Sequence, residues 1–140
     1  MKKVLLFLLF FMPLVSNAQV YYYRTTAFCM KIYSGGYWSD WSDWELSDMK
    51  VKIDTDNDQI IVYSPVVQVY DIIKYVKTYE DNGGGQQMEF VVIDQDYDKG
   101  NVRLRMAPDG TPQMYIDFAD IMWAYNLKQY RVIPSTDAII

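Results

Sequence analysis

Two runs of alternating aspartates are the residues of this 140-residue chain that come closest to a metal site. Their members are Asp54, Asp56 and Asp58 in the first run and Asp94, Asp96 and Asp98 in the second. Alternate carboxylates in a tight loop can gather the hard oxygen ligands that Ca²⁺ prefers. Neither run has the glycine at the sixth place and the glutamate at the twelfth that an EF-hand requires. We expect at most a weak calcium site at Asp54, Asp56 and Asp58, the alternative being that these aspartates only cap turns.

Histidine is absent from the sequence. Its absence excludes Ser-His and Cys-His nucleophilic sites, histidine general bases and histidine metal ligands. A pair of carboxylates could still do acid–base chemistry, but nothing in the sequence pairs two of the 18 acidic residues. The glycines at 83–85 lack the Gly-Lys-Ser/Thr ending of a phosphate-binding loop. We therefore expect a protein that is not an enzyme and that carries no cofactor, the weak calcium site aside.

Three tryptophans, Trp38, Trp41 and Trp44, recur at every third residue. This period places the indoles on one side of a polyproline-II or 3₁₀ segment, whereas in a strand residues three apart lie on opposite faces. Exposed indoles, together with the nearby Tyr37, could hold sugar rings or form a protein contact. The alternative is a tryptophan-rich loop that closes one end of a barrel.

The stretch WSDWS at residues 38–42 resembles the WSxWS box of type I cytokine receptors, and the run at 38–44 resembles the tryptophan ladder of thrombospondin type 1 repeats. In those families, arginine side chains of a neighbouring strand stack with the indoles. Arg103 and Arg105 are two residues apart, so they can lie on one face of a strand and stack in the same way. A single cysteine cannot form the disulfides of those families, so only the stacking is carried over.

The beginning of the chain has the order of a secretory signal peptide. Two lysines precede an apolar run at residues 4–15, and small residues follow at 16–18. The run is shorter than the roughly 20 apolar residues that a membrane-spanning helix needs. We expect residues 1–18 to be removed ahead of Gln19 and the mature protein to be Sec-exported, without a membrane anchor, to the periplasm or the exterior. The signal resembles those of Gram-negative bacteria.

The charge and length of the remaining chain limit its partners and its size. Without residues 1–18 it has 18 acidic and 11 basic residues, a net charge of about −7. This balance argues against a nucleic-acid or anionic-membrane surface. We expect one β domain at residues 19–130, with one core, and a loose tail at 131–140. Cys29 has no second cysteine to pair with, and its alternating surroundings predict a small buried side chain.

Strand-forming residues dominate the composition, with 13 Tyr, 6 Phe and 4 Trp. We expect strands at residues 20–33, 49–54, 59–64, 67–79, 86–95, 101–107 and 113–129, the last with a break near Ala119 and Asp120. Glycine, asparagine, aspartate and proline in the links predict short turns. Seven or eight such strands form an antiparallel meander. We predict that it closes into a small lipocalin-like barrel, with a β-sandwich as the alternative.

The pattern of residues 49–63 predicts a hairpin. Pairing about Asp56 and Asn57 sets Val51 opposite Val62 and Ile53 opposite Ile60 on one apolar face. A two-residue and a four-residue loop leave the same partners opposite each other, so the register is well determined.

Two functions remain open. The expected inward residues are mostly bulky and favour a filled core; they are Phe28, Met30, Ile32, Val62, Leu104, Met106, Ile116, Phe118 and Trp123. We therefore favour an exported, non-enzymatic binding module that contacts a glycan or a protein through the tryptophan surface, with Arg103 and Arg105 beside it. The alternative is a lipocalin-like carrier that holds a small apolar ligand inside the barrel.

Overall fold

The computed structural model describes residues 20–130, and every regular element in this range is a β-strand. The strands are β1 (Val20–Ser34), β2 (Tyr37–Trp38), β3 (Glu45–Leu46), β4 (Lys50–Asp54), β5 (Gln59–Val62), β6 (Gln68–Glu80), β7 (Gln86–Ile93), β8 (Lys99–Met106), β9 (Pro112–Asp117) and β10 (Ile121–Gln129). Within the described range, no helix is long and apolar enough to span a membrane. The expected signal peptide and C-terminal tail lie outside the described residues.

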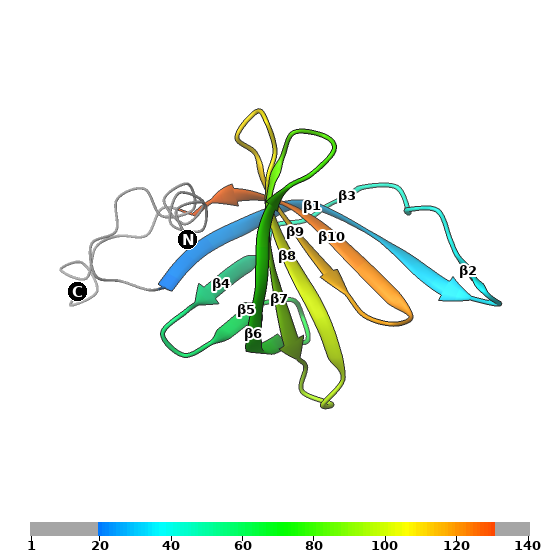
Figure 1. Cartoon of the computed structure of the whole chain (residues 1–140), viewed down its shortest axis with the longest axis horizontal. Helices are drawn as coiled ribbons and strands as arrows, with labels where there is room; N and C mark the ends of the chain where they lie inside the picture. Colours follow the sequence, from blue (N-terminus) through cyan, green and yellow to red (C-terminus); the bar gives the residue numbers. More distant parts are fainter. Residues whose placement is uncertain (1–19, 131–140) are drawn as a thin grey trace.

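Eight of these strands form a closed antiparallel barrel. Sequential strands from β4 to β10 pair with their neighbours, and β1 closes the ring by pairing with both β4 and β10. Figure 1 shows the long strand β1, with β4 beside one end of it and β2 beside the other. The predicted meander that closes into a small barrel is confirmed, and the sandwich alternative is wrong. Closure leaves few unpaired strand edges, which explains how a mostly β chain avoids exposing a long edge.

The hairpin formed by β4 and β5 has the predicted register. Val51 is opposite Val62 and Ile53 is opposite Ile60. All four side chains are buried, at most 4% exposed. The prediction is confirmed because alternation along a strand with one buried face allows only one pairing that keeps every apolar side chain inside.

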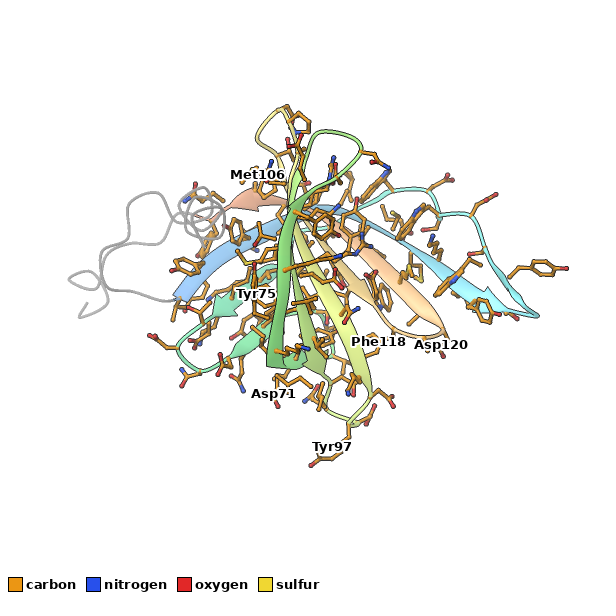
Figure 2. All side chains as sticks on the ribbon, viewed as in Figure 1. Asp71, Tyr75, Tyr97, Met106, Phe118 and Asp120 are labelled. Carbon is orange, nitrogen blue, oxygen red and sulfur yellow. The ribbon has the colours of Figure 1, made fainter. Side chains whose placement is uncertain are left out.

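The interior of the barrel is filled by one hydrophobic cluster. Its residues alternate along each strand with outward-facing ones, as a pleated sheet requires. The cluster consists of Tyr21, Tyr23, Val51, Ile53, Ile60, Val62, Tyr70, Met88, Phe90, Val92, Val102, Leu104, Met106, Met114, Ile116, Tyr125 and Leu127. Figure 2 shows Tyr97, which is outside this cluster, pointing away from the barrel. Burial of this much aromatic and aliphatic surface is the main source of stability.

Three expectations about the strands need correction or refinement. The break near Ala119 and Asp120 is a tight turn between β9 and β10, in which the Phe118 N–H donates to the Ile121 carbonyl. This turn explains why the alternation changes phase there. Ile32, predicted to face inward, is 49% exposed because β1 continues past the barrel wall at that point. β2 and β3 were not predicted, since two-residue strands leave no alternation to detect.

Candidate functional site

Residues 37–49 run antiparallel to β1, along the edge that β10 does not occupy. β2 pairs with Tyr33 and Ser34 at one end of this segment, and β3 pairs with Ala27 and Phe28 near the other. Between β2 and β3 the backbone is not a regular strand. The tryptophan run therefore lies beside β1 rather than across an end of the barrel, and the loop-closure alternative is wrong.

Two serines attach the irregular segment to β1. The Ser39 N–H donates to the Ile32 carbonyl at 2.8 Å, and the Ser39 Oγ accepts from the Ile32 N–H at 2.9 Å. Ser42 makes the same pair of bonds with Met30, at 2.8 and 2.9 Å. A hydroxyl thus replaces the carbonyl that a regular strand would offer, so three residues of the segment match two residues of β1.

This matching explains the period of the tryptophans. The two β1 residues that the serines pair with, Ile32 and Met30, are two positions apart and so lie on the same face of β1. The two serines therefore have equivalent positions, and the residues just before them lie on the same side of the sheet. Trp38 precedes Ser39 and Trp41 precedes Ser42. A regular strand would place these two indoles on opposite faces. The predicted one-sided arrangement is therefore produced by the serines between the indoles.

Lys31 lies between the two indoles. It is the β1 residue between Met30 and Ile32, so its side chain points to the outer face. Its Nζ lies 5.6 Å from the Trp38 ring centroid and 4.8 Å from that of Trp41. Both distances are within the range of cation–π attraction. Lys31 therefore occupies the place that the sequence assigned to an arginine.

The row of contacts continues from Trp41 across the outer face of the barrel. The Trp41 and Tyr115 rings meet edge to face, with centroids 6.2 Å apart. Their backbones are separated by β1 and β10, on which Cys29 and Ala124 are paired. Both are small and buried, only 2% and 3% exposed. Small side chains here let the two rings lean toward each other over the sheet.

Arg103 ends this row. Its guanidinium carbon lies 4.4 Å from the Tyr115 ring centroid, and its Nε and NH2 groups donate to the two carboxylate oxygens of Asp117 at 2.6 and 3.1 Å. We call the set of Tyr33, Lys31, Trp38, Trp41, Tyr115 and Arg103 the aromatic belt. Tyr33 belongs to it because its ring lies 5.4 Å from that of Trp38. The belt crosses β1, β10, β9 and β8 on the outside of the barrel.

The predicted stacking of arginines between indoles is wrong. Arg103 contacts Tyr115 and is one ring away from Trp41. Arg105 is held at the turn between β6 and β7, where its Nε donates to Asp81 at 2.6 Å. The same carboxylate accepts bonds from the Gly83 and Gly85 N–H groups. The hydrogen bond from Arg105 lowers the pKa of Asp81 far below its ordinary value, so this pair stays ionised and fixes the turn.

The belt is partly open to solvent. Trp41 is 39% exposed and the neighbouring Trp44 is 49% exposed, while Tyr37 is more exposed still. Cys29, on β1 between the backbones of Trp41 and Tyr115, is buried as predicted, and its burial raises the pKa of the thiol. The indoles thus seal part of the sheet with one face and present the other to solvent.

The aspartates proposed for calcium do not come together. Among the described residues, no group of three or more carboxylate, cysteine or histidine side chains is placed to hold a metal ion. The carboxylate of Asp54 instead accepts bonds from the backbone N–H and the side-chain amide of Asn57, at 3.1 and 2.9 Å. These bonds lower the pKa of Asp54. Asp54 therefore caps the turn between β4 and β5, which was the alternative considered.

Sequence reasoning missed Lys31 and Tyr115 as members of the belt. Lys31 could have been found from its outward parity within a long strand, but Tyr115 comes from a strand two positions away in the sheet. No protein-family model matches the chain, and no curated protein or solved structure is significantly similar to it.

Proposed function

We propose that this protein is an exported, non-enzymatic binding module whose aromatic belt and flanking residues contact another protein. The observation that carries the proposal is the construction of the belt. Two serines, a lysine and the small Cys29 hold the indoles in fixed positions on an outer face, yet leave them partly exposed. Fixed aromatic side chains lose little entropy on binding and supply much of the energy of protein interfaces.

The surroundings of the belt favour a protein over a glycan as the partner. Leu46 is 93% exposed and pairs with Ala27, which shares the outer face of β1 with Lys31, so aliphatic surface lies on the same face as the rings. Sugars are held mainly by ring faces and polar groups, whereas aliphatic side chains beside aromatic ones are typical of protein contacts. Asp40, Asp43 and Glu45 add negative charge between and beside the indoles. A partner with an apolar centre and basic rim would fit this surface.

The carrier alternative has less support. The large side chains of the core fill the middle of the barrel and are all at most 9% exposed, so the described residues leave a pocket at one end of the barrel and not along its length. A carrier of an apolar ligand needs a dry, unoccupied interior instead. A filled barrel is more consistent with a rigid support for an outer surface.

Site-specific photo-crosslinking in the producing cell tests the proposal. A benzophenone amino acid replaces Trp44, which is 49% exposed and follows Trp41 in the same segment, and in a control it replaces Tyr97, which is highly exposed in the turn between β7 and β8. We expect a discrete, protease-sensitive adduct from position 44 and none from position 97. A glycosidase-sensitive adduct would identify a glycan partner instead. Equal adducts from both positions, or none from position 44, would contradict a binding role for the belt.

A further inference from the structure

A pocket of about 550 Å³ opens at the end of the barrel where β6 begins and where the β7–β8 and β9–β10 turns lie. Its size is in the range of small-molecule sites. Three aromatic side chains, Tyr70, Phe118 and Trp123, form part of its wall. The Tyr70 and Phe118 rings pack 6.1 Å apart at the base of this wall.

The wall depends on a glycine of β8. A Cβ at Gly100 would lie 2.8 Å from two ring carbons of Phe118 and 2.7 Å from the Asp117 carbonyl oxygen. Ordinary side chains cannot come this close, so the ring keeps its place only because residue 100 is glycine. Tyr70 is fixed as well, since its hydroxyl donates to the Gln68 Oε1. The apolar side of the pocket is therefore preformed.

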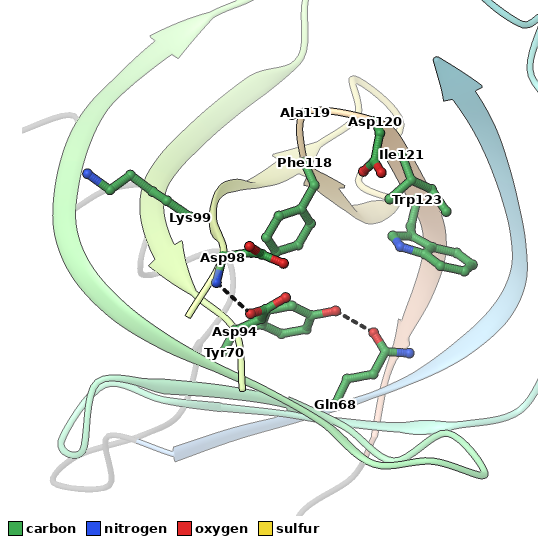
Figure 3. Close-up of a pocket in the computed structure, with 10 residues that line it drawn as sticks. All are labelled: Gln68, Tyr70, Asp94, Asp98, Lys99, Phe118, Ala119, Asp120, Ile121 and Trp123. Carbon is green, nitrogen blue, oxygen red and sulfur yellow. Dashed lines mark hydrogen bonds between the residues drawn. The ribbon is translucent and has the colours of Figure 1, made fainter. Parts of the chain in front are cut away.

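Carboxylates form the polar side of the same pocket. Asp94, Asp98 and Asp120 line it, and Figure 3 shows their carboxylates turned toward the space beside Phe118 and Trp123. Asp94 is oriented by bonds from the backbone N–H groups of Asp96 and Asp98 to its Oδ1, both at 2.9 Å. Within residues 20–130, the carboxylates of Asp98 and Asp120 take part in no ion pair.

The one basic residue of the lining does not neutralise this charge. Figure 3 shows the Lys99 ammonium group pointing away from the other lining residues. The pocket is thus negative on one side and aromatic on the other. An anion would be repelled, and no three of its acidic groups are placed to hold a metal ion.

We propose that this pocket binds a small organic cation, an ammonium group attached to an apolar or aromatic body. The carboxylates would attract the ammonium group, and an aromatic ring beside it would add cation–π attraction. The apolar body would lie against Phe118 and Trp123. This site is at the mouth of the barrel and is independent of the aromatic belt.

Calorimetric titration of the mature protein at low salt tests the proposal with three probes of nearly equal size. They are phenethylamine as the cation, 2-phenylethanol as the neutral analogue and phenylacetate as the anion. We expect the amine to bind more tightly than the alcohol, the anion to bind least, and the preference for the amine to weaken at high salt.

Matched variants locate the binding. Asp98→Asn and Asp120→Asn should each weaken amine binding by about three- to tenfold, since each removes one exposed charge, and should leave alcohol binding unchanged. Asp96→Asn removes the same charge from the same turn but outside the lining, so it should have little effect. Near-ultraviolet circular dichroism checks that each variant is folded. Failure of the amine to bind, equal binding of amine and alcohol, or an equal loss in Asp96→Asn would overturn the proposal.

Discussion

The interior of the barrel and the aromatic belt on its outer face both consist largely of big apolar side chains, but different forces hold them in place. Inside the barrel, every second side chain of each strand points into a closed space, and the exclusion of water from these apolar side chains stabilises their packing. On the belt, serine hydroxyls position the backbone by hydrogen bonds, and a lysine lies over two partly exposed rings. Water remains in contact with the outer rings. The interior therefore provides most of the stability of the fold. The belt adds little to that stability but holds its side chains in a defined arrangement on the surface.

The largest expected effect comes from placing a charge in the interior. Val51→Asp puts a carboxylate at a position with no exposed surface and no partner, which should cost more than about 4 kcal/mol and unfold the protein. Lys52→Thr, on the outer face of the same strand, should cost no more than about 1 kcal/mol, through loss of the Nζ–Asp54 contact at 3.7 Å. Urea unfolding measures both. Similar midpoints would show that the two faces of β4 are wrongly assigned.

A smaller effect is expected on removing the central ring of the belt. Trp41→Ala should cost about 1–3 kcal/mol, because part of the indole is already exposed. It should also uncover Cys29, so that the raised pKa of the thiol falls toward its ordinary value and its reaction with a disulfide reagent begins at lower pH. We expect a faster reaction at neutral pH, because a larger fraction of the thiol is then ionised.

The control for this variant is Tyr37→Ala, which removes a highly exposed ring of the same segment. It should leave the reaction of Cys29 unchanged. An unchanged rate in Trp41→Ala would mean that the indole does not cover the thiol.

The smallest effect concerns the cation of the belt. Lys31→Met keeps the length of the side chain but removes its charge, and should cost about 0.5–1 kcal/mol through lost attraction to Trp38 and Trp41. A double-mutant cycle with Trp41→Leu isolates this coupling. Lys74→Met, on the exposed part of β6, is the matched control. A coupling energy of zero would show that the serines alone position the indoles.

Much of the barrel could be predicted from the sequence because its signals are local. Alternation of valine and isoleucine fixed the register of β4 and β5, since a shift by one residue would expose every apolar side chain. Glycine and aspartate marked the turns, including Gly84 and Gly110, whose positive φ angles of 82° and 89° favour glycine. The one-sided placement of the indoles also followed from a local period of three.

The partners of those indoles were decided by the tertiary structure. Arg103 and Arg105 have a suitable spacing, but Asp117 and Asp81 bind them, because the pairing of β8 with β9 and with β7 brings those carboxylates within hydrogen-bond reach. Lys31 takes the position over the rings because the serine bonds set the tryptophan segment beside β1. Spacing along one strand states which residues share a face. It does not state which distant strand lies next to that face, and closure of the sheet determines this neighbour.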